Sequence, residues 1–251
     1  MVSFFSVVML CSITILPAGD SITAGFHEKP TGSYRYWLEQ KFMTNNIDYD
    51  FIGELSRGGS YMVDANHHGI PGAKIEELAE IPFTRKYSEF DVALVLAGTN
   101  NHWNAPDHDE FVKKYSDLIC AFCPHTVIFA SPPKFGMKAN GPAYWTQEWV
   151  NGRNELTFPA MRSAIQQVAD QNSNVYFVDF FEKSDPFIHL TADGVHLNSA
   201  GHQILAELFF NKMTEIGLVS PEPATMPLMI SGVVLLLLGN HRLKSVTQTA
   251  A

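Results

Sequence analysis

The chain has 251 residues, of which 46% are hydrophobic and 17% are charged, and its formal net charge is −9. This length and composition allow one substantial buried core, so they argue against a disordered body. The acidic balance, with no cluster of lysine and arginine in the globular part, argues against nucleic acid as a partner.

The first residues form an apolar segment that runs directly into a predicted strand. Residues 1–11 lack the basic start of a secretory signal, and Ser12-Ile13-Thr14-Ile15-Leu16 is β-branched and short enough for a buried strand. Cleavage of the first twenty residues as a signal peptide would remove that strand. We therefore interpret residues 1–11 as an incomplete export signal, either uncleaved or begun from a misplaced start.

Ser21 stands in a small-residue turn directly after this strand, in Gly19-Asp20-Ser21-Ile22. A lone serine in such a turn is more often a helix N-cap. At the end of a strand in an α/β sheet, however, it would lie on the rim where ligands bind. A neutral hydroxyl becomes a nucleophile only with a base, a group that orients the base, and donors for the oxyanion.

A base and its orienting group stand together near the far end of the chain. Asp193-Gly194-Val195-His196 places a carboxylate and an imidazole just before a helix predicted over residues 199–216. At this spacing Asp193 can hold one ring nitrogen of His196 while the other nitrogen faces Ser21. A solvated turn with an N-capping aspartate is the alternative for this pattern alone.

Two further turns can supply oxyanion donors. Gly98-Thr99-Asn100-Asn101 follows a predicted strand over residues 91–97, so the Asn100 amide would reach the same rim. The glycine turn over residues 68–74 precedes a short predicted helix, and the backbone N–H of Gly72 is a candidate second donor. Gly69, one turn away, is the alternative.

Taken in order, these four segments resemble the four sequence blocks of the SGNH (GDSL-type) hydrolases, and the resemblance covers roughly residues 12–216. It implies a catalytic triad of Ser21, Asp193 and His196 and no cofactor or metal. It also implies an oxyanion hole made by the N–H groups of Ser21 and Gly72 with Asn100. The third block of the family usually reads GxND, whereas this chain has Asn101 at the position of the aspartate.

Strands and helices alternate along the chain, with a polar glycine loop over residues 56–66. The predicted strands cover residues 12–16, 49–53, 91–97, 126–130 and 175–179, and the predicted helices cover residues 33–43, 75–80, 111–122, 153–170 and 199–216. This alternation predicts a three-layer α/β domain over residues 12–217 with a parallel, doubly wound five-stranded sheet. The family resemblance implies the flavodoxin-like strand order 2-1-3-4-5 of the SGNH hydrolase fold.

Aromatic residues near these blocks are candidates for contact with substrate. His102 and Trp103 follow Asn100 directly, and the segment over residues 134–150 carries Tyr144, Trp145 and Trp149. We interpret His102, Trp103 and Trp145 as substrate-lining residues in a lid or an acyl or sugar wall. Packing of the aromatic side chains explains the segment equally well.

Two other patterns have features of metal or redox sites. Cys120-Ala121-Phe122-Cys123 has suitable spacing, but it closes a predicted helix with only His125 nearby, so buried thiols or one local disulfide are favoured. The polar residues at positions 67, 68, 102, 107, 108 and 109 provide no helical pair that fixes two ligands on one face. The sequence therefore predicts no metal site.

The character of the chain changes after residue 217. Pro221-Glu222-Pro223 is followed by an apolar run over residues 226–239 and then by a basic segment. The region over residues 218–251 resembles the PEP-CTERM sorting tail of exported Gram-negative bacterial proteins. It implies a transient anchor in the inner membrane, a sorting protease that cuts near Pro221, and a final place at the cell surface or in the extracellular matrix.

Together these patterns predict a serine esterase that acts on carboxylic esters of small molecules or glycans. The exopolysaccharide setting implied by the tail favours acetyl esters of carbohydrates. A lipase or thioesterase of the same family stays open, because the loops that would choose the acyl and alcohol parts cannot be placed. The rival from another class is a non-catalytic carbohydrate-binding surface protein, and the presence of Ser21, Asp193 and His196 argues against it.

Overall fold

The computed structural model describes residues 12–25, 33–87, 89–103, 107–138 and 142–220. Residues 1–220 form one compact unit, and a second unit over residues 221–251 lies outside the described residues. The predicted export signal over residues 1–11 and the predicted sorting tail also lie outside them. Both stay predictions.

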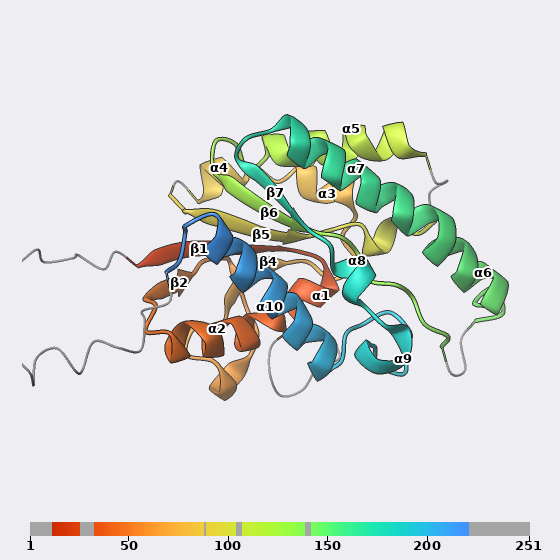
Figure 1. Cartoon of the computed structure of the whole chain (residues 1–251), viewed down its shortest axis with the longest axis horizontal. Coiled ribbons are helices and arrows are strands. Elements are labelled where there is room, and N and C mark those ends of the chain that lie inside the picture. The colour runs from red at the N-terminus through yellow and green to blue at the C-terminus, as the bar shows by residue number, and fades with distance from the viewer. Residues whose placement is uncertain (1–11, 26–32, 88, 104–106, 139–141, 221–251) are drawn as a thin grey trace, which may run out of the picture. The chain divides into compact units, whose positions relative to one another are not determined.

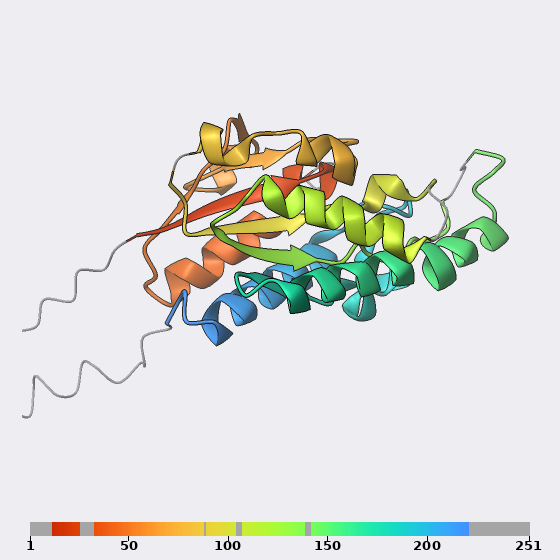
Figure 2. The same cartoon turned by 90° about the horizontal axis from the view of Figure 1, so that it is seen from above.

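A mostly parallel sheet with helices on both faces forms the body of the protein (Figures 1 and 2). Its strands are β1 (Ile13–Gly19), β2 (Tyr49–Phe51), β3 (Leu55–Ser56), β4 (Asn66–Gly69), β5 (Val92–Leu96), β6 (Thr126–Ala130) and β7 (Val175–Val178). One edge of β1 pairs with β5, which is followed by β6 and β7, and the other edge pairs with β2 and β4. The order β2-β1-β5-β6-β7 matches the predicted 2-1-3-4-5 order, so the fold class is confirmed. The predicted number of five strands is wrong, because β3 and β4 extend the described sheet to seven strands.

The loop predicted over residues 56–66 departs from that prediction, because the chain forms a small hairpin there. β3 pairs antiparallel with β4, and a short 3₁₀ turn, η1 (Gly59–Tyr61), lies between them. Asn66-His67-His68-Gly69 has no β-branched residue, so its strand propensity is weak. It becomes a strand because the buried end of β1 at Ala18 and Gly19 needs hydrogen-bond partners on its free edge.

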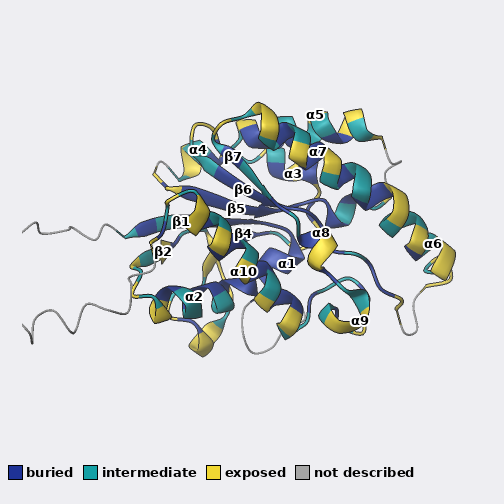
Figure 3. Cartoon of the chain, in the orientation of Figure 1, coloured by how far each residue is buried: buried dark blue, intermediate teal, exposed yellow. Residues whose placement is uncertain are grey.

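The helices cover the two faces of the sheet. In chain order they are α1 (Ser21–Ala24), α2 (Tyr34–Thr44), α3 (Ile75–Ala79), α4 (Phe83–Lys86), η2 (Thr99–Asn101), α5 (His108–Cys120), α6 (Gln147–Gly152), η3 (Arg153–Thr157), α7 (Phe158–Gln171), α8 (Phe180–Lys183), α9 (Pro186–His189) and α10 (Ser199–Glu215). Alternate side chains of each strand face opposite sides of the sheet. One side packs against α3, α5 and α7, and the other packs against α2 and α10 (Figure 3).

The helix boundaries correct several details of the sequence prediction. α5 begins at His108 because the Asp107 carboxylate accepts the Glu110 N–H at 3.0 Å. The helix predicted over residues 153–170 opens with the π turn η3, and α6 precedes it. α4, α8 and α9 were not predicted, because four residues are too few for a periodic pattern.

Two further observations concern the thiols and the membrane. Cys120 and Cys123 are free and exposed at the end of α5, so the expectation of buried or disulfide-bonded thiols is wrong. Among the described helices, none combines the length and the apolar character that crossing a bilayer requires.

Candidate active site

Ser21 lies at a sharp turn where β1 gives way to α1. Gly19 has a φ of +150°, and a Cβ placed there would lie 2.2 Å from the Leu96 carbonyl oxygen, so only glycine fits. The Asp20 carboxylate caps α1 by accepting the Ile22 N–H at 2.9 Å. This turn places Ser21 as the first residue of α1, largely buried but 6% exposed, at the carboxyl edge of the sheet.

His196 lies against Ser21, from the opposite end of the sequence. Its Nε2 is 2.9 Å from the Ser21 Oγ, and its Nδ1 is 2.6 Å from the Asp193 Oδ2. The other carboxylate oxygen of Asp193 accepts hydrogen bonds from the Thr191 hydroxyl and from the N–H groups of Val195 and His196, each at 2.9 Å. The loop before α10 therefore orients the His196 ring toward Ser21.

The surroundings of Asp193 keep its carboxylate ionised. Burial alone would raise its pKa, but the hydrogen bonds from the His196 ring and from the His196 and Val195 N–H groups lower the pKa well below its ordinary value. Both partners are partly shielded from water, since their side chains are 15% and 21% exposed for His196 and Asp193. An ionised Asp193 can stabilise a positive charge on the His196 ring.

A neighbouring segment supports the loop that carries these two residues. The Gly136 N–H donates to the Gly194 carbonyl at 2.9 Å. Gly194 has a φ of +71°, and a Cβ placed there would lie 2.4 Å from the Gly136 carbonyl oxygen. This close approach fixes the loop against the segment that follows β6.

Asn100 and Gly72 lie at the same edge of the sheet as Ser21. Gly19 is paired across the sheet with Leu96 of β5 and Gly69 of β4, and the three residues of interest follow these partners within a few positions. The Asn100 amide donates one proton to the Ala73 carbonyl at 2.9 Å. A side-chain amide carries two protons, so one remains for a ligand.

Gly69 and Gly72 differ in what their N–H groups can do. The Gly69 N–H donates to the His67 ring at 2.9 Å, and a Cβ on Gly69 would lie 2.5 Å from the Ala24 nitrogen. Gly72 is exposed, has a φ of +86° and has no atom within 4 Å of its Cβ position. In the described part of the chain, no hydrogen-bond acceptor faces the Gly72 N–H. Of the two glycines, only Gly72 therefore has an N–H available to a ligand.

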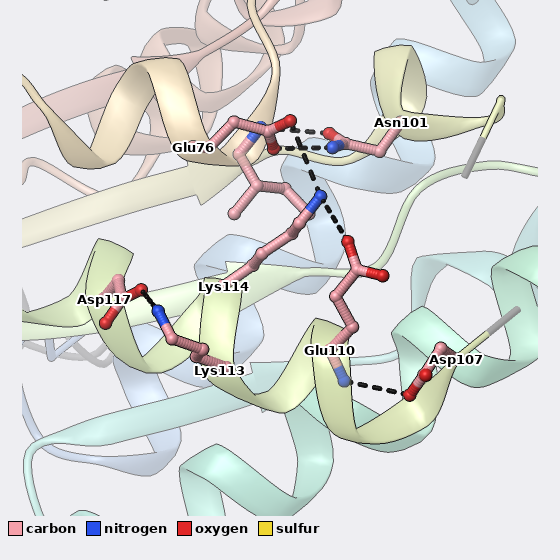
Figure 4. A network of polar contacts seen from close by, with 8 residues as sticks. Glu76, Asn101, Asp107, Glu110, Lys113, Lys114 and Asp117 are labelled. Carbon is pink, nitrogen blue, oxygen red and sulfur yellow. Dashed lines mark hydrogen bonds and ion pairs between the residues drawn. The ribbon is translucent and has the colours of Figure 1, made fainter. Parts of the chain in front are cut away.

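Asn101, the departure in the third block, is completely buried and satisfied. Its Oδ1 accepts the Ile75 N–H at 3.0 Å, and its Nδ2 donates to the Glu76 carboxylate at 2.7 Å (Figure 4). Glu76 was not predicted as a site residue, since a glutamate in the first turn of a short helix is typical of an ordinary solvated residue. No signal in the sequence alone links it to Asn101.

The three aromatic candidates differ in exposure. Trp103 is 57% exposed, and its ring meets the exposed Tyr144 at 5.0 Å. The Nδ1 of the half-buried His102 is 2.8 Å from the Thr99 carbonyl. Trp145 is half-buried, and its indole donates to the Gly136 carbonyl at 3.0 Å, so packing occupies most of it. Contact of His102, Trp103 or Trp145 with substrate stays a prediction.

The two histidines that precede the Gly72 turn, His67 and His68, have partners other than a metal. The ring of His67 accepts the Gly69 N–H, and the Nδ1 of His68 is 2.8 Å from the Tyr87 hydroxyl. Burial lowers the pKa of His67 to about 3, so its ring is neutral. Among the residues that the structure describes, no group of three or more potential ligands could hold a metal ion.

The chain is similar to several solved structures of esterases. A family 3 carbohydrate esterase of Clostridium thermocellum matches with a TM-score of 0.65 and 24% identity over 82% of this chain and 97% of that one. A carbohydrate esterase family 3 protein of Talaromyces cellulolyticus matches with a TM-score of 0.63 and 21% identity over 83% and 100%. A lipase/acylhydrolase of Enterococcus faecalis matches with a TM-score of 0.61 and 18% identity over 84% of this chain and 100% of that one. At these identities the similarity establishes the fold.

The sequence comparison establishes the family. No curated protein matches the chain. The model of the GDSL-like Lipase/Acylhydrolase family, however, matches residues 18–204, which is more than half of the chain and includes Ser21, Asn100, Asp193 and His196. The chain therefore belongs to the GDSL-like lipase/acylhydrolase family and is an ester hydrolase.

Proposed function

We propose that the protein hydrolyses carboxylic esters through an acyl-enzyme on Ser21. The hydrogen-bonded series from Asp193 through His196 to Ser21, with separations of 2.6 and 2.9 Å, carries this proposal. A ring nitrogen at 2.9 Å is within reach to accept the hydroxyl proton. The ionised Asp193 favours the His196 tautomer in which Nδ1 carries the proton and the lone pair of Nε2 accepts the Ser21 proton.

The reaction proceeds in two halves. The Ser21 oxygen attacks the ester carbonyl carbon while its proton passes to the His196 Nε2, and the carbonyl electron pair moves onto the oxygen. The tetrahedral intermediate then expels the alcohol, which takes the proton from His196. Water attacks the acyl-enzyme with the same base, and the bond to Ser21 breaks to release the acid and the free hydroxyl.

Three donors hold the oxyanion in this proposal: the N–H groups of Ser21 and Gly72 and the side-chain amide of Asn100. The free second proton of the Asn100 amide supports its role, and the availability of the Gly72 N–H supports Gly72 over Gly69. One such donor typically contributes ~10²–10³ to kcat. We expect Asn100→Ala to lower kcat by about this factor without unfolding the protein.

We propose acetyl esters of carbohydrates as the substrate class. Two of the similar structures are carbohydrate esterases. The exposed rings of Trp103 and Tyr144 give a surface on which a sugar ring can pack. Trp103→Ala should then raise KM for an acetylated oligosaccharide and leave KM for p-nitrophenyl acetate unchanged. An equal change for both substrates would contradict this substrate class, and preference for long acyl chains would favour a lipase.

Labelling with a fluorophosphonate probe tests the nucleophile. The wild-type protein should become labelled and Ser21→Ala should not, while the control Ser173→Ala, in an exposed turn before β7, should label normally. Circular dichroism checks that each variant is folded. Equal labelling of wild type and Ser21→Ala, or of neither, would overturn the serine mechanism and favour a binding protein.

We also propose export with a sorted C-terminal tail, on the basis of the sequence alone. Pro221-Glu222-Pro223 and the apolar run over residues 226–239 would hold the protein at the inner membrane until a protease cuts near Pro221. In a host with such a sorting system, the wild-type protein should lose its tail and reach the cell surface. Replacement of the three residues by alanine should leave a longer, membrane-associated form; equal processing of both would contradict the proposal.

A further inference from the structure

Two consecutive asparagines of η2 hold the beginning of α3. Asn100 donates to the Ala73 carbonyl at 2.9 Å, while Asn101 accepts the Ile75 N–H at 3.0 Å and donates to Glu76 at 2.7 Å. Gly72 lies directly before the residues that make these contacts. The position of the Gly72 turn relative to the Asn100 amide is therefore set by this group of hydrogen bonds.

Glu76 is matched chemically to the amide of Asn101. Asn101 is completely buried, so the protons of its amide need an acceptor, and Glu76 supplies one. On its other side Glu76 faces Lys114 of α5, whose Nζ is 3.5 Å from one carboxylate oxygen and 2.9 Å from Glu110 (Figure 4). The Lys114 side chain is only 16% exposed, which protects this contact from water.

The charges around the pair keep Glu76 an acceptor. Burial alone would raise its pKa, but its own N–H, the Asn101 amide and Lys114 lower the pKa below its ordinary value. Glu110 lies beyond Lys114, and Glu77 turns back to accept the Lys74 N–H at 2.9 Å. An aspartate in place of Asn101 would therefore bring a second carboxylate against Glu76, and like charges at this distance repel.

We propose that Glu76 and Asn101 act as a matched pair that positions the oxyanion donors Gly72 and Asn100. Glu76 is then a positioning residue that acts through Asn101 and does not itself touch the substrate. This inference rests on the proposed function, because it takes Gly72 and Asn100 as the donors. It implies that the residue at position 101 can become acidic only if position 76 becomes a hydrogen-bond donor.

Exchanging the carboxylate and the amide between positions 76 and 101 tests the pair. In Asn101→Asp the two carboxylates repel, and misplacement of the donors should lower kcat ~10–100-fold with KM nearly unchanged. Glu76→Gln alone retains an acceptor for the Asn101 amide, so its kcat should stay within about threefold of wild type. In the double variant the amide introduced at position 76 can donate to the carboxylate introduced at position 101, and kcat should return to within about threefold of wild type.

The pH profile separates repulsion from general damage. The two carboxylates of Asn101→Asp share a site, so one of them should hold a proton at a raised pKa. The kcat of this variant relative to wild type should therefore rise as the pH falls from about 8 to about 5. Taking the ratio cancels every pH dependence that is common to both proteins. The double variant should show a flat ratio.

Asn211→Asp on α10 is the matched control. Asn211 lies one helical turn from the exposed Glu207, whose pKa is lowered by Lys41 and also by the Asn211 amide, so the same substitution brings a second carboxylate near a glutamate away from the site. It should leave kcat unchanged. Thermal unfolding of every variant shows whether a loss of kcat follows a loss of folded protein.

The outcomes distinguish this inference from the proposed function. Wild-type kcat in Asn101→Asp, or failure of the double variant to recover while it remains folded, would overturn the matched pair and leave the serine mechanism in place. Activity of Ser21→Ala would overturn the serine mechanism whatever the variants at positions 76 and 101 do. A kcat loss in Asn211→Asp equal to that in Asn101→Asp would also overturn the pair.

Discussion

The buried carboxylate of Asp20 should make the stability of the protein fall as the pH rises. Asp20 has no exposed surface; its Oδ1 accepts the Ile22 N–H at 2.9 Å, and its Oδ2 has no hydrogen-bond partner within the described residues. Burial raises its pKa to about 6 from 3.8, although the hydrogen bond from the Ile22 N–H, the nearby Thr99 hydroxyl and the charge of His196 oppose the rise. The folded protein therefore binds this proton more tightly than the unfolded chain does.

The sign and size of the effect follow from this shift. Between pH 3.8 and about 6 the folded state holds more protons at Asp20 than the unfolded state, so its contribution to the free energy of unfolding decreases as the pH rises through this window. Each unit of pKa difference corresponds to about 1.4 kcal/mol. The contribution above the window is then lower by ~3 kcal/mol than the contribution below it.

Asp20→Asn removes the ionisation and keeps an oxygen that can accept the Ile22 N–H. We expect its free energy of unfolding to exceed that of wild type by ~3 kcal/mol at about pH 8 and to match it at about pH 4. Urea unfolding followed by tryptophan fluorescence at both pH values measures the difference, in which all other titrating groups cancel. A difference that is the same at both pH values would refute a raised pKa for Asp20.

Three further predictions concern the surroundings of the site. Asp193→Asn should lower kcat ~10⁴-fold, because the His196 ring loses the charge that orients it, and steady-state kinetics with p-nitrophenyl acetate measures the loss. Gly69→Ala should lower the free energy of unfolding by ~3 kcal/mol, because the added Cβ would clash with the Ala24 backbone nitrogen, whereas Gly72→Ala should lower it by only about 1 kcal/mol. Equal losses for the two variants in urea unfolding would contradict the clash at Gly69. Burial lowers the pKa of His202 to about 3, so its contribution to stability is lost as the pH falls below 6.5. The free energy of unfolding of His202→Met, measured by urea unfolding, should then exceed that of wild type by ~2 kcal/mol at about pH 5 but not at about pH 8.

The order of the strands could be predicted from the sequence because the central strands are recognisable from their own residues. β1, β5 and β6 are short β-branched or apolar runs that are buried on both faces, and parallel strands joined by helices have few possible arrangements. β4 leaves no such signal. Its four residues pair only because Ala18 and Gly19 lie beside them in the folded chain, and a partner brought by folding cannot be seen in a local window.

The contacts of the site also differ in whether they are local in the sequence or depend on the fold. The spacing of Asp193 and His196 is local, so their contact follows from three residues of sequence. The contact of His196 with Ser21 joins positions 175 residues apart, and it depends on the whole strand order. Glu76 is 25 residues from Asn101, and neither residue type indicates a partner by itself.

The buried carboxylate of Asp20 lowers stability but can assist the reaction at the neighbouring Ser21. The carboxylate destabilises the folded protein above about pH 6, yet it lies close enough to His196 for the two charges to attract each other. In the proposed mechanism His196 becomes positive only as the Ser21 proton is transferred. The negative charge of Asp20 therefore favours the transition state more than the ground state, which is the condition for an interaction to raise kcat. Stability and kcat of Asp20→Asn should accordingly change in opposite directions, as expected where a strained group serves a reaction.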